Sequence, residues 1–119
     1  MKNKCFLIVD DDELIRETLA DVVKLLYNTD VIEALNGQEA LDIINSETRE
    51  LILITDINMP IMNGFELVKE VRSKDKSIPI IMMSGYIENE RIQDKEFPDI
   101  KFFGKPVDFD ALKTHIDGL

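Results

Sequence analysis

The chain has 119 residues, of which 45% are hydrophobic and 32% charged, which is the size and composition of one globular domain and not of a disordered segment. Its formal net charge of −10 argues against nucleic acid as a direct partner, because phosphate contacts require lysine and arginine. No apolar run approaches the ~20 residues that a membrane-spanning helix needs, so we expect no membrane insertion.

The first predicted elements are a buried strand and an amphipathic helix. Residues 5–9 form a continuous apolar run, as expected for a strand covered on both faces. This run contains Cys5, the one cysteine of the chain, which we interpret as a buried thiol in a reducing compartment, and so we expect a cytoplasmic protein. Apolar residues then recur at helical spacing, which predicts a helix with the stripe Ile15, Leu19, Val22 and Leu26.

The middle of the chain repeats this alternation of strand and helix. Residues 30–34 alternate weakly between apolar and polar, which favours an edge strand, and a second helix follows. Its predicted face comprises Gly37, Ala40, Leu41 and Ile44. Residues 51–55 form another buried strand, and residues 58–64 form a loop that contains proline and glycine. The third helix has the stripe Leu67, Val68 and Val71.

The last part of the chain completes the pattern. A strand is predicted over residues 78–83, a weakly amphipathic helix over 86–96 and a fifth strand over 100–103. The final helix carries Phe109, Leu112 and Ile116 on its apolar face. Strands that alternate with helices predict an α/β fold, with a doubly wound five-stranded parallel sheet in the order 2-1-3-4-5 and helices on both faces.

Polar residues stand where the predicted strands end. Asp10 and Asp11 follow the first strand and Asp56 follows the third, while Ser84 and Lys105 follow the fourth and fifth. In a doubly wound sheet, ligands bind at the carboxyl ends of the strands, beside the point where the strand order reverses. We therefore expect the three carboxylates to converge there, with the serine and the lysine to one side.

These residue types together favour the chemistry of phosphoryl transfer. Three neighbouring carboxylates repel one another by roughly 1–4 kcal/mol per pair, and a divalent cation relieves this repulsion. Oxygen ligands favour Mg²⁺, which often shares its coordination sphere with a phosphate. A lysine and a hydroxyl can hold phosphoryl oxygens while one carboxylate acts as the nucleophile.

A structural explanation competes at each of these positions. Acids that follow a strand often cap the next helix, and we assign that role to Asp12, with Glu13 in the first helical turn. Taken singly, Asp56 and Ser84 would be turn or capping residues and Lys105 a solvated charge. Their joint placement after the first, third, fourth and fifth strands is what favours a functional site.

Four motifs resemble one known family. The segments "LIVDDDE", "LITDINMPIMNG", "IIMMSGY" and "FFGKP" are similar to those of receiver domains of two-component response regulators, of the chemotaxis receiver type. The resemblance covers nearly the whole chain in order, so it implies a single receiver domain over residues 1–119 with a flavodoxin-like fold. It leaves open whether the domain stands alone or belongs to a larger regulator or hybrid kinase.

The resemblance also implies a role for each site residue. Asp56 would be the phospho-acceptor, supplied by a histidine kinase or a histidine phosphotransfer protein. Asp10, Asp11, Asp56 and the backbone carbonyl of Asn58 would hold Mg²⁺ or Mn²⁺. Ser84 and Lys105 would contact the phosphoryl group, and the Lys105–Pro106 peptide bond would be cis. A protein of this kind catalyses its own phosphorylation and dephosphorylation but is primarily a signalling switch.

The remaining implied roles concern output and lifetime. Ser84 and Phe102 would act as switch residues that change the surface of helix 4, strand 5 and helix 5, where a downstream effector or a second copy would bind. Plain core packing is an equal alternative for Phe102. Asn58 and Tyr86 occupy positions that tune dephosphorylation, and a bulky Tyr86 predicts slow autodephosphorylation.

Two other functional classes compete with a receiver domain. Phosphatases of the haloacid dehalogenase type need a second acid two residues after the nucleophile, and Asn58 cannot do that proton transfer. The serious alternative is a receiver-like protein-interaction module that works without phosphorylation. The presence of the acceptor, the acidic pair and the lysine favours the phosphorylated form.

Overall fold

The computed structural model describes residues 4–75, 77–85 and 98–119. Its elements in chain order are β1 (Lys4–Val9), α1 (Glu13–Tyr27), β2 (Val31–Ala34), α2 (Gly37–Ser46), β3 (Glu50–Asp56), α3 (Gly64–Lys74), β4 (Ile80–Ser84), β5 (Lys101–Gly104) and α5 (Phe109–Asp117). The helix predicted over residues 86–96 lies outside the described residues.

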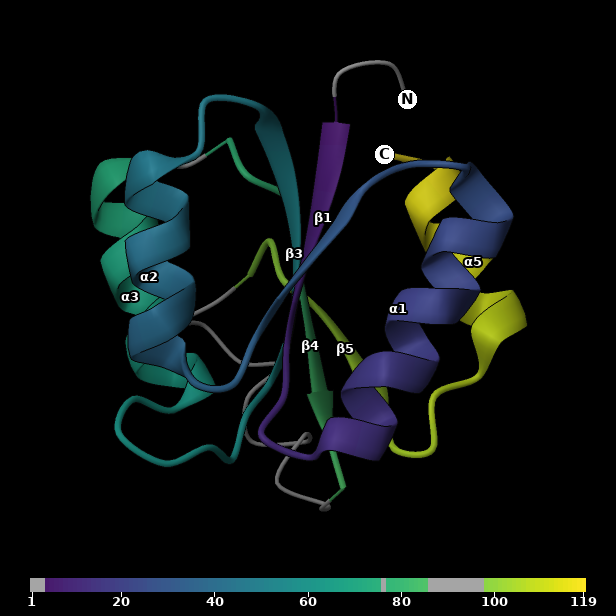
Figure 1. Cartoon of the computed structure of the whole chain (residues 1–119), viewed down its shortest axis with the longest axis horizontal. Coiled ribbons are helices and arrows are strands. Elements are labelled where there is room, and N and C mark those ends of the chain that lie inside the picture. The colour runs from purple at the N-terminus through teal and green to yellow at the C-terminus, as the bar shows by residue number, and fades with distance from the viewer. Residues whose placement is uncertain (1–3, 76, 86–97) are drawn as a thin grey trace.

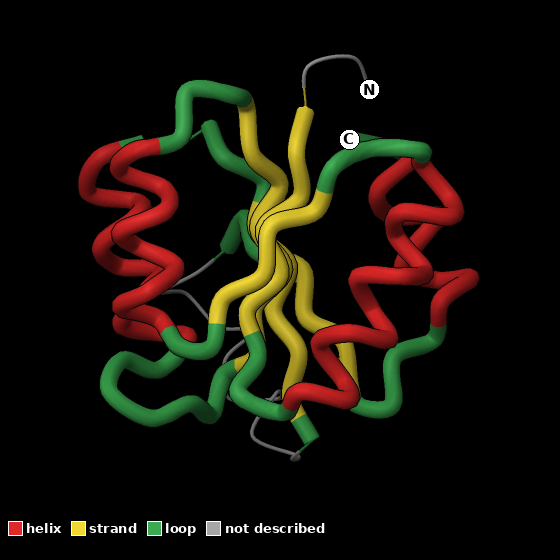
Figure 2. Tube along the Cα trace, in the orientation of Figure 1, coloured by secondary structure: helices red, strands yellow, loops and turns green. Residues whose placement is uncertain are grey.

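The described strands form one parallel sheet in the order β2-β1-β3-β4-β5. Helices α1 and α5 cover one face of this sheet, and α2 and α3 cover the other (Figures 1 and 2). The predicted α/β fold and strand order are confirmed, and β2 is an edge strand as expected. Among the described helices, none has the length and apolar character needed to cross a membrane.

The sheet separates two hydrophobic cores. Along β1, Leu7 and Val9 face the core under α2 and α3, whereas Phe6 and Ile8 face the core under α1 and α5. Successive side chains of a strand point to opposite faces, so a strand buried on both faces must be apolar throughout. This is why the predicted buried strands are continuous apolar runs.

Each described helix begins behind an Asn or Asp that caps it. The capping residues are Asp12, Asn36, Asn63 and Asp108. In each case the side-chain oxygen accepts a backbone N–H of the first helical turn, which has no partner within the helix. These caps fix where the chain leaves each strand-end loop and enters the helix.

The buried face of α1 differs from the predicted one. Arg16, Leu19, Ala20 and Val23 are buried, whereas Ile15 and Leu26 are 37% and 40% exposed. Apolar residues occupy more of α1 than the sheet can cover, so the helical period alone permits two neighbouring faces. Packing selects the face that begins with a charged residue, Arg16.

The other helical faces follow the prediction with one exception. Residues predicted for α2 and α3 are buried or pack against the core. In α5, Leu112 and Ile116 are buried, but Phe109 is exposed because it is the first residue of the helix.

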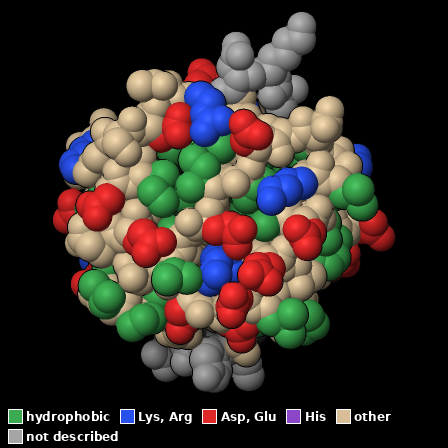
Figure 3. All heavy atoms as spheres, in the orientation of Figure 1, with side chains coloured by type: hydrophobic (Ala, Val, Ile, Leu, Met, Phe, Trp, Pro, Cys, Tyr) green, Lys and Arg blue, Asp and Glu red, His purple; other side chains and the backbone are tan. Residues whose placement is uncertain are grey.

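Several strand boundaries differ from the prediction. β4 begins at Ile80 and not at residue 78, although the Pro79 carbonyl still accepts the Leu53 N–H at 2.9 Å. β3 extends to Asp56 and β4 to Ser84, so these two polar residues end their strands and do not follow them. Acidic side chains are spread over the face of the molecule seen in Figure 3, in keeping with the net charge of −10.

Candidate functional site

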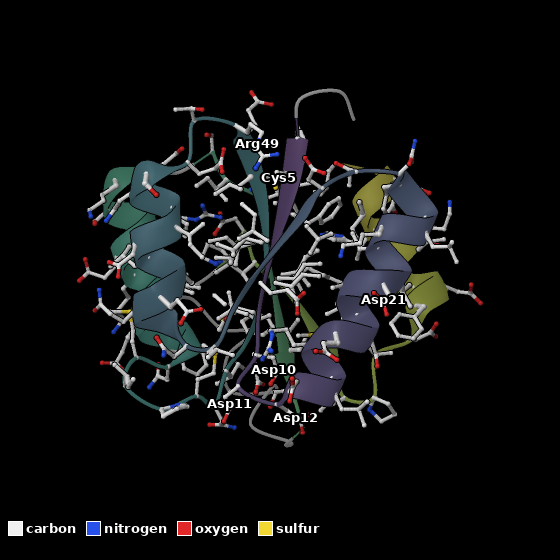
Figure 4. All side chains as sticks on the ribbon, in the orientation of Figure 1. Cys5, Asp10, Asp11, Asp12, Asp21 and Arg49 are labelled. Carbon is white, nitrogen blue, oxygen red and sulfur yellow. The ribbon has the colours of Figure 1, made fainter. Side chains whose placement is uncertain are left out.

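The polar residues predicted to converge stand at one edge of the sheet. Asp10 directly follows β1, Asp56 and Ser84 are the last residues of β3 and β4, and Lys105 directly follows β5. In Figure 4, Asp10, Asp11 and Asp12 lie together at the carboxyl end of β1, while Cys5 lies near its opposite end. The parallel order of the strands thus brings residues from four segments to one place.

Three carboxylates form a cluster at this edge. One oxygen from each of Asp10, Asp11 and Asp56 lies within 4.8 Å of the others. Asp10 is 0% exposed, Asp56 is also buried, and Asp11 is exposed to solvent. A dense set of like charges at a partly open edge is costly without a cation, and it offers only oxygen ligands. The donor set therefore fits Mg²⁺ or Mn²⁺.

Lys105 bridges two of the three acids. Its Nζ lies 2.8 Å from Asp10 Oδ2 and 3.1 Å from Asp56 Oδ2. Burial acts to lower the pKa of Lys105, but the hydrogen bond that Lys105 donates to Asp10 and the charge of Asp56 outweigh it and raise that pKa. The lysine is consequently held as a cation within reach of both carboxylates.

The surroundings of Asp56 perturb its carboxyl group. Burial, followed by the charge of Asp10, raises the pKa of its carboxyl group, and the nearby Lys105 ammonium acts in the opposite direction. Its Oδ1 accepts the backbone N–H of Ile57 at 2.9 Å, while Oδ2 faces Lys105. The carboxylate is therefore oriented by a backbone donor on one oxygen and a cation on the other.

The loop after β3 packs directly against Asp56. Gly64 begins α3, and a Cβ atom there would lie 2.4 Å from the backbone oxygen of Asp56. The Gly64 N–H donates to the Ile57 carbonyl at 2.8 Å, which closes the loop against the end of β3. Asn58 lies in this loop, two residues after Asp56, and is exposed. Only glycine permits so close an approach of two backbone segments.

Other predicted features are found where expected. Asp12 caps α1 by accepting the Ile15 N–H at 3.1 Å, and Glu13 is in the first helical turn. The Lys105–Pro106 peptide bond is cis. Ser84 is buried, and its carbonyl accepts the Lys105 N–H at 2.9 Å, which ties the ends of β4 and β5 together.

Two aromatic residues, Phe102 and Tyr86, have predicted roles at this site. Phe102 is buried in the core under α2 and α3, whereas the adjacent Phe103 packs edge-on against His115, with 6.2 Å between the ring centroids. Tyr86 lies outside the described residues. The role of either residue in switching or dephosphorylation stays a prediction.

The sequence-based prediction missed two residues beneath the site. Arg16 donates to the backbone carbonyl of Asp10, and Glu33 of β2 pairs with Arg16. One signal was present in the sequence, because Arg16 stands at helical spacing from Leu19, Ala20 and Val23. A charged residue at the head of an apolar stripe needs a partner at the end of a strand.

Comparison with known proteins identifies the class. Residues 6–117 match the family described as "Response regulator receiver domain". The chain belongs to this family, and its fold and acidic strand-end cluster are those of a receiver domain of two-component signalling.

Particular relatives point the same way. The chain is 39% identical over 118 residues to sporulation initiation phosphotransferase F of Bacillus subtilis, with 98% of this chain and 93% of that protein covered. It is 44% identical over 80 residues to a chemotaxis protein CheY homologue of Campylobacter jejuni, which covers 66% of this chain and 62% of that protein. A response regulator receiver protein from Pseudomonas putida has a similar structure, with a TM-score of 0.88, 26% identity and coverage of 100% of this chain and 99% of that one.

Proposed function

We propose that residues 1–119 form a single phospho-accepting receiver domain in which Asp56 takes a phosphoryl group from a histidine kinase or a histidine phosphotransfer protein. The observation that carries this proposal is the Lys105 bridge between Asp10 and Asp56 within a cluster of three carboxylates. A cluster with only a structural role would not need a third carboxylate, that of Asp11, beside the two that Lys105 bridges. The buried free Cys5 further supports a cytoplasmic location.

The metal would be held by oxygen ligands of this chain. Asp10, Asp11, Asp56 and the backbone carbonyl of Asn58 are the residues that would hold Mg²⁺ or Mn²⁺. When bound, the cation supplies positive charge that offsets the carboxylates and the oxygens of the transferring group. The raised pKa of Asp56, caused first by burial and then by the charge of Asp10, supports this need for a cation.

The chain's own residues would carry out the transfer. A carboxylate oxygen of Asp56 forms a bond to phosphorus while the phosphorus–nitrogen bond of the donor's phosphohistidine breaks, and the imidazole keeps that electron pair. Lys105, 3.1 Å from Asp56 Oδ2, is placed to follow the charge from the carboxylate to the phosphoryl oxygens. The Ser84 hydroxyl would donate to another of these oxygens.

Phosphorylation would then change an output surface. In this proposal Ser84 moves toward the phosphoryl group and Phe102 repacks, which alters an output surface that includes β5 and α5. A downstream effector or a second copy of the chain would bind there. The buried position of Phe102 on β5, which β4 separates from β3, supports such a coupling.

The proposal is tested by phosphorylation with acetyl phosphate, read by intact mass. Wild-type protein with Mg²⁺ should gain one phosphoryl group, and neither Asp56→Asn nor wild type with excess EDTA should gain one. Lack of labelling in the wild type would instead favour an interaction module that works without phosphorylation. Equal labelling of Asp56→Asn would assign the acceptor to another residue.

A further inference from the structure

We propose that Arg16, held by Glu33, is a positioning residue that sets the peptide between Asp10 and Asp11 and thereby the geometry of the acidic pair. This inference rests on the proposed function, because it assigns Arg16 a task in metal binding. Arg16 itself lies on α1, is only 8% exposed and belongs to none of the motifs that resemble the family.

Every polar group of Asp10 takes part in a hydrogen bond or an ion pair. Its N–H donates to the Ala34 carbonyl at 3.2 Å, and its carbonyl accepts from Arg16 Nη1 at 3.0 Å. Its Oδ1 accepts the Asp12 N–H at 2.9 Å, and its Oδ2 pairs with Lys105 at 2.8 Å. Asp10 is therefore held by the edge strand on one side and by Arg16 on the other.

The planarity of the peptide bond lets Arg16 act on Asp11 through the peptide that precedes it. The carbonyl held by Arg16 belongs to the peptide that joins Asp10 to Asp11, at the point where the chain leaves β1. A planar peptide whose carbonyl is fixed also has a fixed Cα direction on its far side. The contact thus orients Asp11, which is exposed and has no strand to hold it.

Arginine suits position 16 better than lysine would. Arg16 uses Nη1 for the Asp10 carbonyl and Nε for Glu33 Oε1 at 3.1 Å, so one rigid group joins α1, β2 and the end of β1. A guanidinium presents donors in a fixed planar fork, whereas a lysine has a single nitrogen on a flexible stem. Lysine at this position could keep one contact well but not both.

Glu33 neutralises the positive charge that Arg16 brings near the acid cluster. An unpaired arginine beneath the site would offset part of the negative charge that attracts a divalent cation. Glu33 is only partly exposed and neutralises Arg16 at 3.1 Å. The pair therefore supplies a charged hydrogen-bond donor to Asp10 without changing the net charge near the three carboxylates.

The chain contains a matched control for this arginine. Arg72 of α3 also donates through Nη1 to a backbone carbonyl, that of Ile78 at 2.8 Å, and pairs with Asp99 at 2.8 Å. Ile78 precedes β4, so this contact lies at the amino edge of the sheet, away from the acid cluster. Substitution of Arg72 therefore removes the same kind of contact, but at the amino edge of the sheet and away from the acid cluster.

The test compares Arg16→Met with Arg72→Met, after circular dichroism has shown that both are folded. Mg²⁺ binding is measured by isothermal titration calorimetry, and amide exchange at Asp12 by NMR in metal-free protein. Arg16→Met should weaken Mg²⁺ binding about 10-fold or more and speed Asp12 exchange to a similar extent, with changes under about twofold for Arg72→Met. Unchanged values in Arg16→Met, or equal changes in Arg72→Met, would overturn the inference.

A second variant keeps the test valid if Arg16→Met does not fold. Arg16→Lys retains one donor for the Asp10 carbonyl, so it should bind Mg²⁺ within about threefold of wild type. An Arg16→Lys protein that loses as much affinity as expected for the Met variant would contradict positioning through that contact. If wild type binds Mg²⁺ but Asp56 is not labelled, the proposed function fails while the role of Arg16 stands. If wild type does not bind Mg²⁺, the Asp12 exchange rates alone decide.

Discussion

Lys105 Nζ lies 2.8 Å from Asp10 Oδ2, so the lysine that follows β5 is paired with an acid that precedes it by 95 residues. In this arrangement the lysine neutralises one of the carboxylates that would hold a cation. A lysine expected to serve the phosphoryl group therefore also competes with the metal for Asp10.

This competition predicts opposite effects of removing Lys105. Lys105→Met should bind Mg²⁺ at least about fivefold more tightly, because a unit positive charge near the acids is lost. Its initial rate of phosphorylation by acetyl phosphate should fall about 100-fold, since one donor to the transferring group is missing. Calorimetry and intact mass measure the two quantities. Lys101→Met, which removes an exposed lysine at the start of β5, should change neither. Weaker Mg²⁺ binding by Lys105→Met would exclude the competition.

Asp56 should destabilise the metal-free protein. Burial and the charge of Asp10 raise its folded-state pKa above 3.8, so the folded state binds more protons and stability falls as pH rises above that value. At neutral pH, the free energy of unfolding of Asp56→Asn should exceed that of wild type by roughly 1 kcal/mol, which corresponds to a few degrees of Tm. The variant keeps its remaining ion pair, because Lys105 still pairs with Asp10. Thermal melts in EDTA measure this difference.

Mg²⁺ should reverse the order of stability of wild type and Asp56→Asn. A cation that binds only the folded state stabilises it by mass action, and wild type keeps every proposed ligand. The Tm of wild type should therefore rise with Mg²⁺ more than that of Asp56→Asn. Asp21→Asn, an exposed acid on α1 (Figure 4), serves as the control and should behave as wild type. A wild-type Tm that is unaffected by Mg²⁺ would contradict the assignment of the acidic pair.

Gly64 should resist substitution, and Gly85 should tolerate it. A Cβ at Gly64 would lie 2.4 Å from the Asp56 carbonyl oxygen and 2.9 Å from Ile57 Cα, whereas one at Gly85 meets nothing within 4 Å. Gly64→Ala should cost roughly 1–3 kcal/mol by overpacking and should slow phosphorylation by displacing Asp56. Urea unfolding compares the two variants, and equal midpoints would argue against this close packing.

Tyr27 should titrate far above its usual range. Burial, and then the hydrogen bond from its hydroxyl to Asp117 at 3.0 Å, raise the Tyr27 pKa to about 12. The raised pKa means that this contribution to stability is present below pH ~10 and is lost as pH rises through ~12. Phenolate absorbance in a Tyr86→Phe background isolates Tyr27, since the chain has two tyrosines. Asp117→Asn should lower the pKa, and Asp110→Asn should not.

The phosphoryl lifetime should depend on Tyr86. A bulky side chain two residues after Ser84 would exclude the attacking water, so Tyr86→Ala should lose its phosphoryl group faster than wild type. Decay of the phosphorylated mass after removal of the donor measures this rate. Asn58, two residues after Asp56, is the second position at which substitution should alter the decay. Identical decay in wild type and Tyr86→Ala would remove Tyr86 from the explanation.

The helical period predicted less well than the strand pattern. Continuous apolar strands and their polar ends were correct because a strand buried on both faces leaves few alternatives. In α1, however, the stripe through Ile15 and Leu26 is as regular as the one through Arg16 and Val23. Hydrophobicity favours the first, and the observed packing uses the second. With this face buried, Arg16 also donates to the Asp10 carbonyl.

By itself, the sequence determined the order of elements, the parallel sheet and the residues gathered at its carboxyl edge, because strand ends in such a sheet must share one edge. Only the tertiary structure decided how those residues pair. Lys105 contacts Asp10 as well as Asp56, and Arg16 holds the peptide after Asp10 with Glu33 as its partner. The contacts of Lys105 join side chains distant in the chain, and the contact of Arg16 joins a helix to the end of a strand. They depend on directions and distances of a few ångströms, which residue spacing does not contain.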